Sequence, residues 1–303
     1  MKDIAILLPC YNEELTIKKV INDFKKELPK ASIYVYDNNC IDNTALIAKE
    51  NGAIVVKETF QGKGNVVKSM FEDIDADIYV MADGDDACPA NMVHDLIEPI
   101  ISKKVHMSIG DRHSNGTYKR ENDRSLHNFG NNLVKYLINR LFKANLKDIM
   151  CGYRVFSKDF VKNIPILSSG FEIETEMTLH ALDKKFKIEE IPIEYKNRPE
   201  GSFSKLNTIS DGIKVIKTIF WLFKDYRPLL FFTILSAIFF ILGLVFGFSV
   251  IIEFVNTSKI SKIPSAILSV GLILTSLLTL FSGFILDTIV KQYKQNYFIQ
   301  IKK

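Results

Sequence analysis

The sequence predicts an α/β domain built on a mostly parallel sheet, followed by an amphipathic segment and two transmembrane helices. Two observations predict the domain: short apolar runs alternate with stretches of helical periodicity, and polar clusters follow several of the apolar runs. This βαβ rhythm is typical of a sheet that helices cover on both faces. A third observation, two long uncharged runs near the C-terminus, predicts the membrane helices.

The expected strands are short apolar runs that end in polar turns. They cover residues 4–8, 33–36, 53–56, 78–81 and 105–109. Apolar residues at three- and four-residue spacing predict helices over 15–28, 44–51, 65–74, 91–102 and 126–142, and a further helix begins within 170–176. Ligands bind outside the carboxyl ends of the strands in open sheets of this kind, so the site is expected at that edge.

Polar residues gather after three of the expected strands. Pro9 to Glu13 follow the first strand, Asp37 to Thr44 the second, and Asp83 to Asp86 the fourth. Taken alone, each cluster can be explained by a structural role that involves no ligand. Asn12 or Asp42 can cap a helix, and an isolated D-x-D is commonly a solvated turn. Their joint placement predicts a nucleotide-sized cleft. Paired carboxylates there suit a hard divalent cation that also holds phosphate oxygens.

Basic side chains recur near these clusters. Lys63 lies between two glycines just before a predicted helix, a pattern that suits an anion but is not a Walker A loop; a solvated lysine in a plain loop is the alternative. Arg112 lies in the segment that ends the fifth expected strand, and Arg124 precedes the helix over 126–142. Arginines beside an acidic metal site suit a reaction in which two anions meet, whereas surface salt bridges are the alternative.

Composition excludes several classes of function. The chain has 303 residues, 47% of them hydrophobic, and a net charge of +4, which is too mild for a nucleic-acid-binding domain. Four widely spaced cysteines without a C-x-x-C pair predict small packing residues in a reducing compartment, and the five histidines lack a metal-ligand spacing. The first residues do not resemble a signal peptide, so the N-terminal domain is expected in the cytosol.

The C-terminal part predicts a membrane hairpin. No charged residue occurs from Pro228 to Ile252 or from Ile263 to Leu286, and each run can cross about 30 Å of hydrocarbon. A buried helix pair of a soluble protein is the alternative. Lysines and arginines flank the outer ends of the hairpin, so the positive-inside rule places the globular domain and both termini in the cytoplasm.

Four parts follow from these patterns. A globular domain is expected over 1–206, an amphipathic helix over 207–227, a two-helix hairpin over 228–290 and a basic cytosolic tail over 291–303. The amphipathic helix is expected to lie along the lipid headgroups, with packing on the globular domain as the alternative.

Six motifs, in chain order, resemble those of the family 2 glycosyltransferases. Within that family they are similar to the dolichyl-phosphate mannose synthases and the bacterial polyprenyl-phosphate glycosyltransferases. The motifs are P-x-Y-N-E at Pro9 to Glu13, D-N-x-x-x-D-x-T at Asp37 to Thr44, the Asp83-x-Asp85 pair, G-x-R at Gly110 to Arg112, D-x-x-x-G-Y-R at Asp148 to Arg154, and Arg198 followed by Ser204-Lys205-Leu206. The resemblance spans nearly the whole chain. It implies a GT-A (nucleotide-diphospho-sugar transferase) fold and inverting transfer of one sugar from a nucleotide sugar to a polyprenyl phosphate.

The resemblance also implies roles for the motif residues. Asp83 and Asp85 would hold Mg²⁺ or Mn²⁺ on the donor diphosphate, with Asp86 left open as a third ligand. Asp148 would lie near the acceptor as an orienting residue, because an ionised phosphate needs positioning more than a general base. The remaining expected contacts are to the nucleotide sugar, from Pro9, Tyr11, Glu13, Asp37, Lys63 and Lys205, and to the lipid phosphate, from Arg112, Arg124 and Arg198.

The donor and the class of protein have alternatives. A UDP-hexose, glucose or N-acetylglucosamine, is expected as the donor, with GDP-mannose as the alternative. Sugar-nucleotide pyrophosphorylases, processive polysaccharide synthases and a non-catalytic nucleotide-sugar binder are the competing classes. The expected partners are the nucleotide sugar, the polyprenyl phosphate and the lipid bilayer, and a homo-oligomer through the spans is left open.

Overall fold

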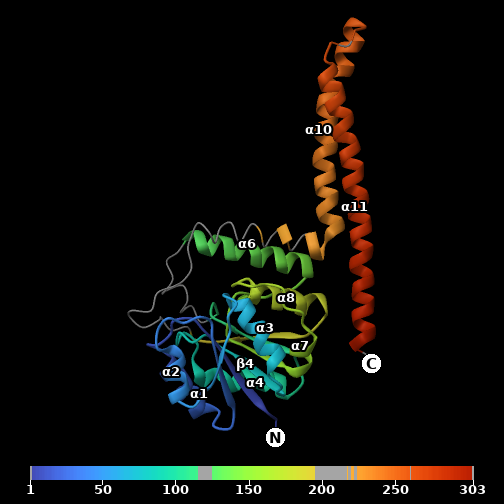
Figure 1. Cartoon of the computed structure of the whole chain (residues 1–303). Helices are drawn as coiled ribbons and strands as arrows, with labels where there is room; N and C mark the ends of the chain where they lie inside the picture. The colour runs from blue at the N-terminus through green and yellow to red at the C-terminus, as the bar shows by residue number, and fades with distance from the viewer. Residues whose placement is uncertain are drawn as a thin grey trace. The chain divides into compact units, whose positions relative to one another are not determined.

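A computed structural model describes residues 2–114, 125–194, 217, 220–221, 224–259 and 261–301. The chain separates into two compact units, Met1–Val215 and Ile216–Lys303 (Figure 1). Most of the predicted amphipathic helix over 207–227 lies outside the described residues.

The first unit is built on a seven-stranded sheet with the order β3-β2-β1-β4-β6-β5-β7. Every pairing is parallel except those of β6, which runs antiparallel to β4 and to β5. The predicted α/β class with a mostly parallel sheet is therefore confirmed. The strands are β1 Ile4–Cys10, β2 Ser32–Asp37, β3 Ile54–Lys57, β4 Ile78–Met81, β5 Met107–Asp111, β6 Arg154–Ser157 and β7 Ile188–Pro192.

Helices follow most of the strands, as the apolar spacing predicts. Helix α1 buries Ile17, Val20, Ile21 and Phe24, which lie on one face at three- and four-residue spacing. All four residues of β4 are buried, and because successive strand residues point to opposite faces, both faces of the sheet are covered. The helices are α1 Ile17–Glu27, α2 Thr44–Glu50, α3 Lys63–Asp73, the 3₁₀ turn η1 Ala90–Met92, α4 Val93–Ile101, α6 Ser125–Phe142, α7 Lys158–Asn163 and α8 Ile173–Asp183.

Strands β6 and β7 were not among the expected strands. Strand β6 has only four residues and begins with an arginine, and β7 contains Glu189 and Glu190, so neither shows a long apolar run. Their pairing with distant strands, which a local pattern does not report, places them in the sheet.

Strand order decides where the site lies. Strand β1 pairs with β2 on one side and with β4 on the other, so the carboxyl ends of these three strands are neighbours. The chain moves outward from β1 through β2 to β3 and then returns to β4 on the opposite side of β1. Open α/β sheets bind ligands at such a switch point. The predicted meeting of three polar clusters at one sheet edge is confirmed.

The second unit is a helical hairpin of α10, Pro228–Thr257, and α11, Ile263–Ile301. Both helices are long and apolar enough to span a membrane. The most apolar 18-residue window has a mean hydropathy of 2.8 within Pro228–Thr257 and of 2.1 within Ile263–Tyr297. The expected spans are thus present as candidate membrane helices.

Small residues join the two helices. Ser236 Oγ donates to the Ser276 carbonyl oxygen at 2.9 Å, and Ser269 Oγ donates to the Gly243 carbonyl oxygen at 2.7 Å. A Cβ at Gly243 would lie 2.8 Å from Ile273, so this close approach requires glycine. Close contacts through small and hydroxyl-bearing residues are typical of membrane helix pairs. These contacts are within one chain, and the part of the chain that the structure describes gives no support for the homo-oligomer left open above.

Candidate active site

A small cavity of about 60 Å³ lies beyond the carboxyl ends of the central strands. It brings together the acidic turn after β4, Arg112 from the end of β5 and the segment that precedes β6. The lining residues are Asp83, Asp85, Ala87, Cys88, Arg112, Cys151, Gly152 and Ile193. The structure therefore places the predicted metal carboxylates and the predicted phosphate-binding Arg112 around one space.

The acidic turn is held against strand β1 and helix α1. Thr16 Oγ1 donates to the Gly84 carbonyl oxygen at 2.6 Å, and a Cβ at Gly84 would lie 2.7 Å from Cys10 Sγ. Asp85 is 3% exposed, and its Oδ1 accepts the Ala87 N–H at 3.1 Å. The turn is fixed in place, which keeps the Asp85 carboxylate at the cavity wall.

Asp86 points to a different partner. Its Oδ1 lies 2.7 Å from Lys19 Nζ on α1, and its backbone has a positive φ of 61° at the tight turn. Asp86 is absent from the residues that line the cavity. The geometry favours a role in the turn over the third metal ligand that the sequence left open.

Lys63 joins the acidic turn to helix α8. Its Nζ lies 2.5 Å from Asp83 Oδ1 and 2.6 Å from Glu174 Oε1, and only 9% of its side chain is exposed. Burial alone would lower the pKa of Lys63, but the two carboxylates outweigh it and raise the pKa above its usual range. Lys63 is thus a buried, charged partner of Asp83, and the alternative of a solvated lysine is wrong.

Gly152 allows the chain before β6 to approach this ion pair. A Cβ at position 152 would lie 2.7 Å from Asp83 Oδ2 and 2.9 Å from Lys63 Nζ, closer than side-chain atoms pack. A larger residue at position 152 would displace the Asp83 or Lys63 side chain, so the glycine preserves this ion pair where the fifth motif meets the third.

The N-terminus of α3 contacts protein. The backbone N–H groups of Gly64 and Asn65 donate to the Ser169 carbonyl oxygen at 3.1 and 3.4 Å. Gly62 has a φ of 129°, and a Cβ there would lie 2.1 Å from the same oxygen. The expectation that this helix end faces an anion is wrong for these two amides, because a carbonyl already accepts from them.

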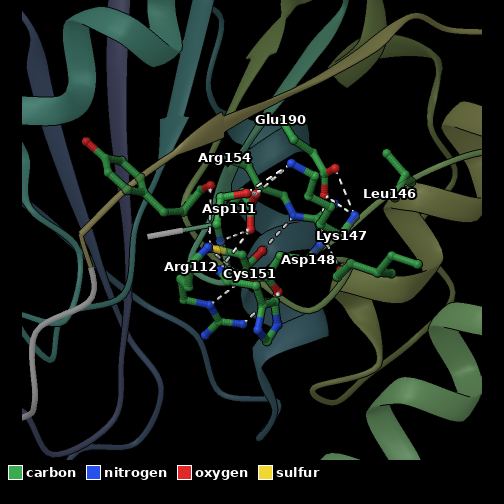
Figure 2. Close-up of polar contacts among 12 residues, drawn as sticks. Asp111, Arg112, Leu146, Lys147, Asp148, Cys151, Arg154 and Glu190 are labelled. Atoms are coloured by element: carbon green, nitrogen blue, oxygen red, sulfur yellow. Dashed lines mark hydrogen bonds and ion pairs between the residues drawn. The ribbon is translucent and has the colours of Figure 1, made fainter. Parts of the chain in front are cut away.

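Arg112 and Asp148 form a bidentate ion pair (Figure 2). Arg112 Nε donates to Asp148 Oδ2 at 2.7 Å, and Nη2 donates to Oδ1 at 2.9 Å. The Asp148 side chain is 2% exposed, against 19% for that of Arg112. Burial alone would raise the pKa of Asp148, but the guanidinium outweighs it and holds the pKa below its usual range. Asp148 therefore stays ionised and fixes the plane of the guanidinium at the cavity wall.

Glu190 on β7 holds the backbone that carries Asp148 (Figure 2). Its Oε1 accepts the Asp148 N–H at 2.7 Å, and both of its oxygens accept the Lys147 N–H at 2.8 Å. Burial raises the pKa of Glu190, and the nearby carboxylates of Asp111 and Asp148 add to the rise. Glu190 is a positioning residue that the motifs did not identify, since this contact joins residues 42 positions apart.

The loops on either side of the ion pair are fixed from within. Asp111 Oδ1 accepts the His113 N–H at 2.8 Å and so shapes the turn that carries Arg112. Arg154, fully buried, donates through Nε to the Cys151 carbonyl oxygen at 2.8 Å and through Nη2 to the carbonyl oxygen of Ile149. Buried side chains thus fix the conformation of both loops beside the cavity.

The first two predicted clusters are joined to each other. The Glu13 N–H donates to Thr44 Oγ1 at 2.8 Å, which links the turn after β1 to the start of α2. Asp37 Oδ1 accepts a backbone N–H three residues further on, at 2.7 Å. Pro9 lies within β1, and Tyr11, in the turn that follows, is 38% exposed. These four predicted nucleoside contacts share one edge of the sheet.

Two cysteines of the cavity are thiols of low reactivity. Burial raises the pKa of Cys151 to about 12 and raises the pKa of Cys88 well above its usual range. Because the thiolate is the nucleophile, neither side chain is suited to covalent catalysis. This agrees with the packing role expected for the cysteines.

The acidic turn fits a divalent cation that shares its coordination with a substrate. Among the described residues, no group of three or more His, Cys, Asp or Glu side chains could hold a metal ion. Asp83 and Asp85 do line one cavity, and Mg²⁺ or Mn²⁺ commonly binds through one or two carboxylates together with substrate phosphates. The donor set therefore suits a cation that a diphosphate helps to hold.

Some predicted residues are not described, and others were missed. Arg124, Arg198 and Lys205 lie outside the described residues. Glu174 was noted only as part of a helix start, and its pairing with Lys63 depends on tertiary packing. An acidic residue at a buried position of α8 was the available signal.

Comparisons with known proteins agree with this geometry. Residues 5–164 match the family described as glycosyl transferase family 2. Glycosyltransferase AglJ of Haloferax volcanii is 31% identical over 296 residues, which cover 96% of this chain and 95% of that protein. The dolichyl-phosphate beta-glucosyltransferase of Saccharomyces cerevisiae is 26% identical over 248 residues, covering 71% of this chain and 72% of that protein.

A solved structure shares the fold. The glucosyl-3-phosphoglycerate synthase of Mycobacterium tuberculosis, crystallised with Mn²⁺, UDP and glucosyl-3-phosphoglycerate, superposes with a TM-score of 0.58 at 19% identity, covering 74% of this chain and 79% of that one. This likeness confirms the predicted GT-A fold. The match over residues 5–164 and the nearly full-length similarity to AglJ show that the chain is an enzyme that belongs to the family 2 glycosyltransferases.

Proposed function

We propose that the protein transfers one hexose, with inversion, from a nucleotide-diphospho-sugar to a polyprenyl phosphate. The observation that carries this proposal is the cavity in which Asp83 and Asp85 face Arg112. Carboxylates suit a cation bound to one anion, the donor diphosphate, and a guanidinium suits a second anion, the acceptor phosphate. The two reacting partners are both anionic, so one site needs both kinds of group.

On the donor side, Asp83 and Asp85 would hold Mg²⁺ or Mn²⁺, which neutralises the charge that develops on the departing nucleoside diphosphate. Pro9, Tyr11, Glu13 and Asp37 would contact the nucleoside, since they lie at the neighbouring strand ends. The solved relative with Mn²⁺ and UDP supports a metal of this kind in the fold.

On the acceptor side, Arg112 would orient the phosphate. Asp148 holds the guanidinium through two hydrogen bonds and acts as a positioning residue. A phosphate monoester is already ionised near neutral pH, so no proton has to be removed from it. This chemistry supports positioning over general-base catalysis at Asp148.

The proposed step balances without a further reactant. A phosphate oxygen of the acceptor forms a bond to the anomeric carbon as the bond from that carbon to the donor diphosphate breaks. The electron pair of the broken bond leaves with the nucleoside diphosphate. Attack on the face opposite the leaving group inverts the anomeric configuration.

A UDP-hexose, glucose or N-acetylglucosamine, is the proposed donor, with GDP-mannose as the alternative. The printed name of the yeast relative, a dolichyl-phosphate beta-glucosyltransferase, supports a glucosyl donor and a polyprenyl phosphate acceptor. Membership of the glycosyltransferase family sets aside a pyrophosphorylase or a non-catalytic binder.

The lipid acceptor also agrees with the candidate membrane helices. Helices α10 and α11 would anchor the enzyme in the bilayer that contains the acceptor. Lysines and arginines flank the outer ends of the hairpin, which supports a cytoplasmic location for the first unit and for both termini.

The test uses the full-length protein in detergent with Mg²⁺ or Mn²⁺. Radiolabelled UDP-glucose, UDP-N-acetylglucosamine and GDP-mannose are each incubated with undecaprenyl phosphate and with dolichyl phosphate, and organic-extractable label is counted. We expect one donor to give a lipid-linked product that requires the metal. Failure of every pair to give such a product would overturn the proposal.

A further inference from the structure

The Lys63 ammonium lies between two carboxylates, one of which is a proposed metal ligand. Asp83 Oδ1 is 2.5 Å from Lys63 Nζ, and Glu174 Oε1 is 2.6 Å from the same atom. The side chains of Lys63 and Glu174 are 9% and 7% exposed, so water screens their charges weakly. A cation this close to Asp83 opposes the binding of a second cation there.

Glu174 offsets that opposition. It contacts Lys63 from α8, where it is 5% exposed. Removal of its charge would leave the Lys63 charge to be balanced by Asp83 alone. Removal of Lys63 would instead leave Glu174 and Asp83 as neighbouring carboxylates without their shared cation. Lys63 should therefore lower the affinity of Asp83 for a metal ion, whereas Glu174 should raise it.

The position of the ammonium is tightly constrained. Lys63 is the first residue of α3, whose next two backbone N–H groups donate to the Ser169 carbonyl oxygen. On the opposite side, Gly152 leaves no room for a Cβ beside Lys63 Nζ or Asp83 Oδ2. The ammonium is thus held by its two short ion pairs, and the backbone of Gly152 packs beside it.

We propose that Lys63 keeps the intrinsic affinity of Asp83 and Asp85 for a divalent cation low, and that Glu174, as the second carboxylate partner of Lys63, limits this effect. The metal then binds tightly only together with the nucleoside diphosphate. The negative charge of the diphosphate supplies the attraction that Lys63 removes. Release of the nucleoside diphosphate then also releases the metal, which leaves the site ready for the next donor. This inference rests on the proposed function, in which Asp83 is a metal ligand.

The test measures Mn²⁺ binding by electron paramagnetic resonance of free Mn²⁺, with the full-length protein in detergent, in the absence and presence of UDP. Lys63→Met removes the ammonium at similar size and should tighten Mn²⁺ binding without UDP by roughly tenfold or more. Glu174→Gln should weaken Mn²⁺ binding, measured with UDP present, by roughly tenfold. The gain in Mn²⁺ affinity on addition of UDP should shrink in Lys63→Met.

Matched controls separate this effect from general damage. Lys68→Met removes an exposed lysine from the same helix, and Glu172→Gln removes an exposed carboxylate next to α8. Both should bind Mn²⁺ as the unaltered protein does. Lys63→Arg keeps the charge and should keep the affinity weak without UDP.

A double variant keeps the proposal testable if Lys63→Met does not fold, because that change leaves a buried carboxylate without its partner. Lys63→Met combined with Glu174→Gln removes one charge of each sign and should bind Mn²⁺ about tenfold more tightly than Glu174→Gln alone. The inference would be overturned if the double variant and Glu174→Gln bound Mn²⁺ with equal affinity. It would also be overturned if Lys63→Met and Glu174→Gln changed the Mn²⁺ affinity in the same direction. The proposed function would be contradicted by a different result, in which the protein binds Mn²⁺ and UDP normally but forms no lipid-linked product.

Discussion

The Arg112 guanidinium lies edge to edge with the Asp148 carboxylate, with Nε 2.7 Å from Oδ2 and Nη2 2.9 Å from Oδ1. A bidentate pair of this kind fixes both the position and the plane of the arginine. The acidic partner is buried and the arginine is partly exposed at the cavity, so the contact holds a cationic group toward a ligand.

Asp148→Asn removes the charge that holds Arg112 but leaves a side chain of similar size. We expect the KM for the polyprenyl phosphate to rise by about tenfold to a hundredfold, because charge-assisted hydrogen bonds contribute about 1.5–3 kcal/mol. The KM for the nucleotide sugar should change little. Steady-state kinetics with each substrate varied in turn measures both values, and Asp159→Asn, an exposed change on α7, is the control. A fall in kcat alone would point instead to a chemical role for Asp148.

The same pair predicts a pH dependence of stability. The pKa of Asp148 is lower in the folded protein than the value of about 3.9 in an unfolded chain. Its stabilising contribution is therefore complete above pH 3.9 and is lost as the pH falls through the folded pKa. Thermal unfolding followed by circular dichroism from pH 6 to pH 3 should show a smaller loss of Tm in Asp148→Asn than in the unaltered protein. Parallel curves for the two proteins would contradict this assignment.

Glu190→Gln weakens the two backbone contacts that hold residues 147 and 148 (Figure 2). We expect a loss of about 1 kcal/mol in the free energy of unfolding and a several-fold higher KM for the lipid acceptor, with an unchanged KM for the donor. Glu189→Gln, the exposed neighbour on the same strand, is the matched control. If the variant and the control gave equal acceptor KM values, Glu190 would have no positioning role.

Asp85→Asn tests the metal site. The buried carboxylate lies at the cavity wall, and its loss should lower kcat by a factor on the order of 10² to 10³, since stabilisation of the leaving group requires the cation. Asp86→Asn should keep both its activity and its Mn²⁺ dependence, because Asp86 pairs with Lys19. Circular dichroism checks that both variants are folded. The reverse order of the two effects would assign the metal to Asp86.

The sequence by itself determined the class of fold, the positions of five strands and the two apolar helices. Each of these depends on periodicity or hydrophobicity within a short window, and such local patterns survive in the final structure. The three polar clusters were also predicted to meet, because parallel strands direct their carboxyl ends to one edge. Six ordered motifs then led to the glycosyltransferase family.

Only the tertiary structure decided which of these polar residues contact one another. Lys63 reaches Asp83 across 20 positions, Arg112 reaches Asp148 across 36, and Glu190 reaches Asp148 across 42. No spacing rule encodes such contacts, because they depend on how loops from different strands pack at the sheet edge. The strength of each contact depends further on burial, which removes the screening of charge by water. For this reason the residue types of the site were readable from the sequence, whereas the roles of Lys63, Glu174 and Glu190 were not.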